Sequence, residues 1–199
     1  MKPIWHVVWV TAFSVLAAGA ALAEDEGAAL LQMMKERDRA IQDVVRSDTG
    51  GEGETGREKL KQIIGELFDY RTLAEHSLRR YWGKRTEEEQ VAFTDLYRRL
   101  LEKNYADPKL YTKSDKIDYI GVEMDGEKTT LRTRVHYKNE QSSIDYLFHK
   151  VDGTWLIYDM VIDDLSVVDN NYSQFRKEIR KSSYEGLVKK LQDKLVEEE

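Results

Sequence analysis

The chain of 199 residues has no cysteine, two prolines and four histidines. Without cysteine, a disulfide, a thiolate metal site and a cysteine nucleophile are all excluded, so stability must come from packing. Pro108 is the only proline beyond residue 23, and a shortage of proline favours helices. The formal net charge of −6 argues against general binding to nucleic acid, because proteins of that class carry an excess of lysine and arginine.

Long apolar runs are confined to the first residues. Lys2 precedes an apolar stretch over 4–20, and Ala21-Leu22-Ala23 comes just before an acidic run over 24–26. This pattern predicts a signal peptide over 1–23 with an A-x-A cleavage site. The alternative, a retained membrane anchor, would need about 20 apolar residues. We therefore expect an exported, soluble single domain over 24–199.

Apolar residues at helical spacing predict most of the remaining chain as helix. The expected helices span 24–46, 57–67 and 70–82, a stretch beginning after Thr86, and finally 172–181 and 184–196. Thr86 and Glu89 have the spacing of a capping box. Four glycines within 47–56 predict a flexible loop between the first two helices.

Between residues 117 and 162 the apolar period changes to that of strands. Strands are expected over 117–124, 127–137, 142–151 and 154–162, with two-residue turns at Asp125-Gly126 and Asp152-Gly153. The predicted fold class is α+β. A four-stranded antiparallel meander would have its apolar face covered by the N-terminal helices, with two helices at the C-terminus.

The hairpin turns also predict which side chains share a face of the sheet. The first turn groups Ile120, Val122, Leu131, Thr133, Val135 and Tyr137. The second turn groups Ile144, Tyr146, Phe148, Trp155, Ile157 and Val161, and leaves Leu147, Val151, Leu156, Tyr158 and Met160 on the reverse. A two-residue connection at Asn139-Glu140 would merge these groups into one concave apolar surface, whereas a three-residue connection would separate them.

The chemistry of the sequence leaves three classes of function open. Helices over a broad apolar sheet face either close an ordinary core or leave a cleft for an apolar ligand. The motifs of serine hydrolases, zinc proteases and phosphate-binding loops are missing. An enzyme that uses Asp145, Asp159 or His149 as a base and a non-catalytic interaction module with a closed core are the alternatives to a carrier.

A basic cluster follows the third expected helix. Arg79, Arg80, Lys84 and Arg85 flank Tyr81 and Trp82. The cluster is either a solvated helix end or a contact site for anionic head groups or an acidic partner, because arginine forks match phosphate and aromatic rings suit the border between oil and water.

Three segments, in this order along the chain, resemble the MlaC family of periplasmic phospholipid-shuttle proteins. They are Phe68-Asp69-Tyr70, LRRYWGKRTEEEQVAFTDLYRRLLEKNYA and DGTWLIYDMVIDDLSVVDNNYSQFRKEI. The resemblance covers about residues 30 to 195. Two departures lie near the C-terminal helices: Asp164-Leu165-Ser166 stands where the family often has Gly-Val-Ser, and Asn171-Tyr172 where it often has Tyr-Arg. They put partner contacts in that region in doubt.

The resemblance implies a cone-shaped, NTF2-like lipid-binding scaffold. It implies a carrier that moves phospholipid between an outer-membrane lipoprotein complex and an inner-membrane ABC transporter with MCE domains, without a cofactor or metal. Exposing roughly 30 acyl methylenes at about 0.8 kcal/mol each would cost on the order of 20 kcal/mol, so the tails require an enclosed cleft. The expected lining is Tyr81, Trp82, Phe93, Leu96, Tyr97, Leu100, Leu101, Tyr105, Leu131, Val135, Ile144, Tyr146, Phe148, Trp155, Ile157 and Val161.

Overall fold

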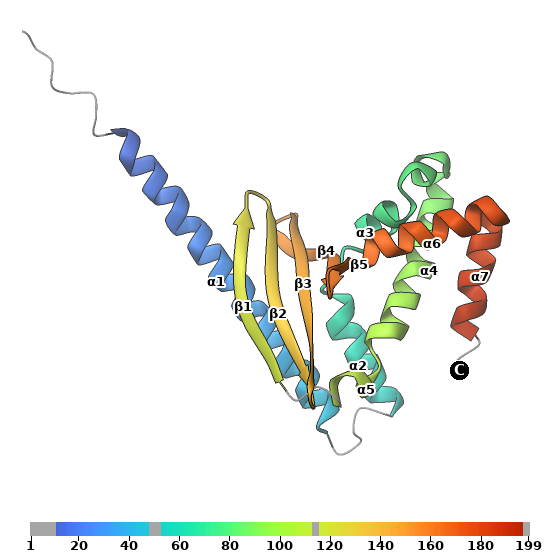
Figure 1. Cartoon of the computed structure of the whole chain (residues 1–199), viewed down its shortest axis with the longest axis horizontal. Coiled ribbons are helices and arrows are strands. Elements are labelled where there is room, and N and C mark those ends of the chain that lie inside the picture. The colour runs from blue at the N-terminus through green and yellow to red at the C-terminus, as the bar shows by residue number, and fades with distance from the viewer. Residues whose placement is uncertain (1–10, 48–52, 113–115, 197–199) are drawn as a thin grey trace, which may run out of the picture.

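The computed structural model describes residues 11–47, 53–112 and 116–196 (Figure 1). The helices and strands before the long hairpins are α1 (Thr11–Val45), α2 (Glu54–Gly65), α3 (Tyr70–Leu78), the 3-10 helix η1 (Arg79–Lys84), α4 (Glu87–Tyr105) and α5 (Pro108–Thr112). The later ones are β1 (Lys116–Asp125), β2 (Lys128–Tyr137), β3 (Glu140–Val151), β4 (Thr154–Ile162), β5 (Leu165–Ser166), α6 (Val167–Lys181) and α7 (Tyr184–Val196).

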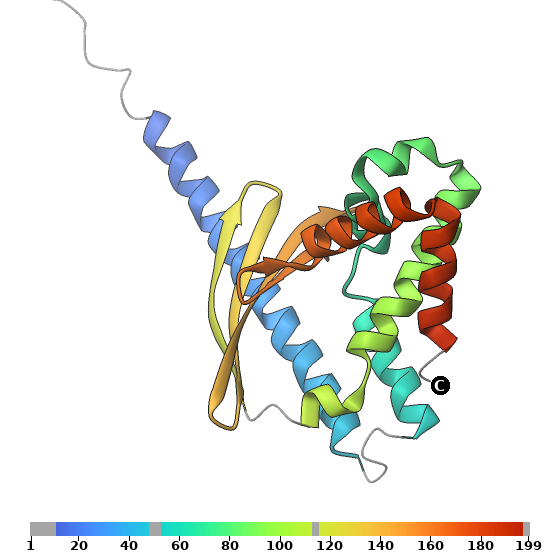
Figure 2. The same ribbon diagram turned by 45° about the vertical axis from the view of Figure 1, so that its right-hand side comes forward.

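The strands form one antiparallel sheet in chain order, and α1 packs against β1. Figures 1 and 2 show α1 crossing behind the long strands and the other helices gathered beside the sheet, with α6 leaving directly from the end of β4 and β5. The segment before α3 joins the two parts, because Ile157 donates its backbone N–H to Leu67 O at 2.8 Å and accepts from Asp69 N at 3.0 Å. The α+β class is confirmed.

The sheet has five strands, so the prediction of four is wrong. The extra strand, β5, pairs Leu165 with Ile162 and Ser166 with Val161. Two aspartates in the left-handed region, Asp163 at φ +48° and Asp164 at φ +66°, reverse the chain between β4 and β5. Aspartate tolerates this conformation better than most residues, but without glycine the dipeptide does not stand out as a hairpin turn.

The merged apolar face of the sheet is confirmed, since Leu131 of β2 lies opposite Tyr146 of β3. The turn between these strands is Lys138-Asn139 rather than Asn139-Glu140, because Tyr137 pairs with Glu140. The first hairpin likewise turns at Gly126-Glu127, one residue later than predicted. Both turns keep two residues, so each shift leaves the grouping of faces unchanged. The turn at Asp152-Gly153 is as predicted, with Val151 opposite Thr154.

Two β-bulges change the predicted faces locally. A register shift between Tyr119 and Gly121 leaves Ile120 55% exposed and places Tyr119 opposite Thr133. A second shift on β3 and β4 places Met160 opposite Tyr146, and Val161 opposite Asp145. The predicted inward positions of Ile120 and Val161 are therefore wrong, and Tyr119 and Met160 take inward positions instead, because each extra residue reverses the alternation of the strand beyond it.

The helices largely follow their sequence signals, although α1 begins at Thr11 instead of 24 and α6 at Val167 instead of 172. The capping box at α4 is present, with Thr86 accepting from Glu89 N and the Glu89 carboxylate accepting from Thr86 N. The predicted helix over 70–82 instead ends at Leu78 and continues as η1, because Arg79 adopts φ +46°, outside the helical region. The short helix α5 has no counterpart in the prediction. It begins at Pro108, and proline suits the first position of a helix, where no N–H partner is lost.

Candidate functional site

An apolar cavity of about 110 Å³ lies between α1, the inner face of the sheet, and the ends of α2, α4 and α5. The α1 helix contributes Met34 and Ile41 two turns apart, with Arg37 and Asp38 between them. Both side chains that the bulges turn inward, Tyr119 and Met160, line it. The other lining residues are Ile64, Leu67, Phe68, Tyr105, Tyr111, Ile117, Thr133, Tyr146 and Ile157.

Apart from Arg37, Asp38 and Thr133, the polar side chains of this cavity are tyrosines, whose hydroxyls are held in their neutral form. Burial raises the pKa of Tyr111, Tyr119 and Tyr146, and the nearby Asp38 carboxylate raises it further in each case. Burial also raises the pKa of Asp38, against the opposing charge of Arg46. The Tyr111 hydroxyl donates to Tyr105 O at 2.6 Å. The cavity therefore offers apolar side chains and neutral phenols to a ligand.

A charged groove shares the α2 helix with the cavity. It encloses about 780 Å³ between α2 and α4 and is open to solvent. Its walls carry acids and bases together, namely Glu54, Glu58, Lys59, Lys61, Glu66, Arg98 and Glu102. The ion pair between Arg37 of the cavity and Glu66 of the groove, at 2.7 Å, lies where the two hollows meet. An apolar chamber and a charged groove are thus neighbours.

The structure places the expected cleft residues in several surroundings. Tyr105, Tyr146 and Ile157 line the cavity, and Leu131 and Phe148 are fully buried in the same core. Val135 is buried opposite Ser142. Ile144 and Trp155 are half-buried on the sheet, where Lys150 lies over the Trp155 ring at 4.8 Å. Val161 lies on the outer face, as described above.

The expected residues of α4 other than Tyr105 lie away from the cavity. Phe93 and Tyr97 each contact the Phe175 ring of α6, with ring centroids 6.0 Å apart in both pairs. Leu96 and Leu101 are buried in the same helical layer, and Leu100 is half-buried against it. Trp82 is buried in η1, and Tyr81 is half-buried beside it. These residues do not line the cavity.

The cavity residues on α1, α2 and α5 were missed by sequence reasoning. The spacing of Met34 and Ile41 indicates an apolar stripe on α1. Several other expected helices have such stripes, and the sequence does not indicate which stripe faces the sheet. Tyr111 belongs to the unpredicted α5, and Tyr119 turns inward only because of a bulge.

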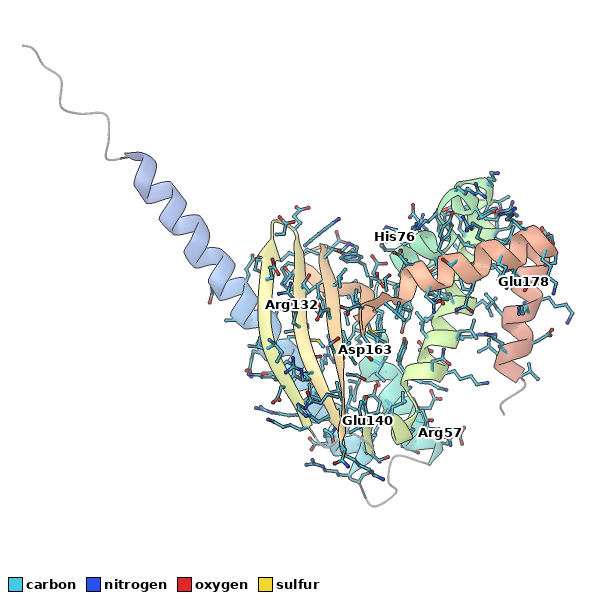
Figure 3. All side chains as sticks on the ribbon, viewed as in Figure 1. Arg57, His76, Arg132, Glu140, Asp163 and Glu178 are labelled. Carbon is cyan, nitrogen blue, oxygen red and sulfur yellow. The ribbon has the colours of Figure 1, made fainter. Side chains whose placement is uncertain are left out.

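The residues considered as catalytic bases each have structural partners. Asp145 lies 3.6 Å from Arg132 on the outer face of the sheet, and His149 Nε2 lies 2.9 Å from Asp69 Oδ2. Buried Asp159 accepts from Met160 N, Val168 N and the Ser166 hydroxyl, and so holds the start of α6. The structure does not bring Asp145 and His149 into one site. Figure 3 shows Arg132 on the sheet among other exposed polar side chains.

Over 11–47, 53–112 and 116–196, no group of three or more histidines, aspartates and glutamates is arranged to hold a metal ion. Within the same ranges, no helix combines the length and the apolar character that crossing a membrane requires. Residues 1–10 of the predicted signal peptide lie outside these ranges, and 11–23 form the first part of α1.

The family model described as MlaC protein matches residues 35–193. No curated protein matches the chain. Among solved structures, a phospholipid-binding protein from Ralstonia solanacearum, in complex with a phospholipid, is similar with a TM-score of 0.69 at 21% identity. The match covers 83% of this chain and 96% of that one. This likeness shows a shared fold. Since the family model spans most of the sequence, the chain belongs to the MlaC family, a family of periplasmic proteins.

Proposed function

We propose that this protein is a phospholipid carrier that holds acyl tails between α1 and the inner face of the sheet. The observation that carries the proposal is the apolar cavity under α1, next to a charged groove. Such a pair of hollows suits a ligand with an apolar and a charged end. Membership of the MlaC family and the fold shared with a protein that binds phospholipid support the same conclusion.

The size of the cavity implies that its walls move apart when a tail enters. An engineered cavity of about 150 Å³ accommodates benzene, so the 110 Å³ here has room for only a few carbon atoms. Burial of each methylene stabilises the complex by about 0.8 kcal/mol, which offsets the loss of contacts between the walls. The cavity walls on α1 and on the sheet belong to different elements and are the surfaces that would separate.

Within this proposal, the domain over 24–199 moves phospholipid between an outer-membrane lipoprotein complex and an MCE-domain ABC transporter in the inner membrane. Family membership supports this role, and the energy for direction would reside in the transporter. The head group would lie toward the charged groove, where Arg37 and Glu66 separate the two hollows. Carriage by burial of tails needs neither a cofactor nor a metal.

Organic extraction and mass spectrometry of protein purified without detergent test the carrier role. We expect phospholipid in the native protein, and at least a tenfold loss in Met34→Trp, because the indole fills a cavity of this size. Met33→Trp is the matched control, since Met33 is the neighbouring half-buried methionine of α1 and does not line the cavity. Native protein without extractable lipid would favour a closed-core interaction module. Equal lipid in both variants would place the tails elsewhere.

Export is tested separately. The A-x-A site predicts that protein recovered from the periplasm begins at Glu24, which N-terminal sequencing can establish. An intact Met1 on membrane-bound protein would show that residues 1–23 are retained as an anchor.

A further inference from the structure

A cluster of cations and tyrosines covers the surface where η1 meets α6. We name it the basic aromatic patch, and it consists of Arg79, Arg80, Tyr81, Lys84, Tyr172 and Arg176. All four cations of the patch are exposed, and both tyrosines are half-buried. Neither of the hollows described above includes any of these residues. The patch is therefore a separate surface feature.

The tyrosine rings hold the cations in place. The guanidinium of Arg79 lies 4.4 Å from the centre of the Tyr172 ring, and that of Arg176 lies 5.7 Å from the same ring. Arg80 and Lys84 lie 5.0 Å and 5.9 Å from the centre of the Tyr81 ring. Arg79 and Arg80 are adjacent in the sequence, so the two ring sites are neighbours on the surface. α6 supplies half of this arrangement, which the sequence alone did not reveal.

Most of the positive charge of the patch has no acidic partner among the residues that the structure describes. Arg79 pairs with Asp169, whereas the ion pairs found among the described residues include none for Arg80, Lys84 or Arg176. Arg85, which the sequence placed in the same cluster, belongs elsewhere: its guanidinium lies 4.4 Å from the Tyr184 ring and 3.5 Å from Glu89. A guanidinium stacked on a ring keeps its N–H donors available at the edge, in the geometry that binds phosphate oxygens with two hydrogen bonds.

Among the described residues, the patch includes no exposed large apolar side chain of the kind that commonly fills a pocket at the centre of a specific protein interface. Such interfaces centre on large apolar or aromatic side chains that fill pockets on the partner. The exposed large apolar side chains of the described residues, namely Val91, Leu110, Ile120, Val151, Leu165 and Val196, all lie outside the patch. Half-buried tyrosines beside exposed cations are instead typical of proteins that rest at the border between lipid and water.

We propose that the basic aromatic patch docks the protein on the surface of membranes that contain anionic phospholipid. Docking would be weak and reversible, because each cation near such a surface contributes only about a fivefold factor in binding. The patch would also orient an otherwise acidic molecule, whose net charge alone would keep it away from a negative surface. The head groups would contact the patch at the surface, whereas a carried lipid would have its tails in the cavity.

Sedimentation with vesicles tests this docking. The purified protein, in the form that accumulates in cells, is mixed with vesicles of phosphatidylcholine containing phosphatidylglycerol, or of phosphatidylcholine alone. We expect binding only to the anionic vesicles, lost at about 1 M salt, where the screening length falls to about 3 Å. Arg80→Gln with Arg176→Gln should weaken binding about 25-fold, since two cations are removed.

Arg57→Gln with Arg134→Gln is the matched control, because it removes two exposed arginines from α2 and β2 and changes the net charge equally. Figure 3 shows Arg57 on α2, away from η1. We expect the control to bind within twofold of the native protein, with both variants melting like it. Equal loss in the two variants, or no binding of the native protein to anionic vesicles, would overturn the proposal. Sedimentation measures only the binding of the protein to vesicles. A negative result would therefore contradict membrane docking without contradicting the proposed carriage of phospholipid, which lipid extraction tests.

Discussion

Asp69 connects the helices to the sheet through a single carboxylate. It caps the start of α3 by accepting from Thr72 N at 2.9 Å, accepts the Thr72 hydroxyl at 2.7 Å, and pairs with His149 of β3. Its own backbone N–H donates to Ile157 of β4. His149, which was considered as a catalytic base, therefore contacts a residue with a structural role. No spacing in the sequence indicates this contact.

Replacing Asp69 by alanine should destabilise the protein by about 2 kcal/mol at neutral pH, from the lost cap and the lost partner of His149. Burial acts to raise the pKa of Asp69, but its hydrogen bonds with Thr72 and His149 lower that pKa overall, below 3.8. A carboxylate with a lowered pKa stabilises the fold above its unfolded pKa and loses this contribution as the pH falls through the folded value. The difference between native protein and Asp69→Ala should therefore shrink below pH 3.8.

Denaturant unfolding at a series of pH values measures this difference. Asp145→Asn is a suitable control, because the Asp145 pair with Arg132 lies on the outer face of the sheet, where ion pairs contribute about 0 to 1 kcal/mol. A difference for Asp69→Ala that stays constant with pH would mean that the carboxylate charge is not what stabilises the junction.

Among the elements, those with strong local signals could be predicted from the sequence. The start of α4 follows from the capping box, and the hairpin of β3 and β4 follows from Asp152-Gly153, where both residues have positive φ. Even where a turn was predicted one residue too early or too late, the faces stayed correct, because both versions have two residues. Local backbone preferences determined these features, so local reasoning was sufficient.

Other features of the helices and strands depend on contacts between residues that are far apart in the sequence. The bulges at Ile120 and between Leu147 and Phe148 reverse the alternation of their strands, and although Gly121 lies beside the first, no glycine marks the second. The break of α3 at Arg79 has no proline or glycine either, and the Arg79 side chain is held by Tyr172 and Asp169 from α6. Tertiary packing overrides local propensity at these positions, so a single sequence cannot place them.

At the scale of the whole molecule, the sequence indicated that an apolar sheet face meets helices, but not which helix covers it. Phe93 and Tyr97 form an apolar stripe as regular as that of α1, yet they face Phe175 of α6. The cavity instead joins α1 to residues as distant as Met160, so its composition depends on the complete fold. Of the cavity residues, Tyr146 and Ile157 of the sheet were predictable because hairpin register is local, and Tyr105 was the one predicted from a helix.

If α1 and the sheet part to admit a lipid tail, a covalent link between them should block uptake. A Cβ atom at Gly27 of α1 would lie 3.5 Å from Val122 Cγ1 of β1, so cysteines at 27 and 122 are placed within reach of a disulfide. The chain has no cysteine of its own, so Gly27→Cys with Val122→Cys can form only this bond within one molecule. We expect the oxidised variant to be folded, to melt at a higher temperature than its reduced form, and to exchange phospholipid with vesicles at least tenfold more slowly.

The reduced form of the same variant is the control for this experiment, because it has the same side chains without the link. Its exchange rate should match that of the native protein, and addition of reductant to the oxidised sample should restore it. Rapid exchange by the oxidised variant would mean that tails enter without separation of α1 from β1. The wall that moves would then be α2, where the Arg37–Glu66 ion pair divides the cavity from the charged groove.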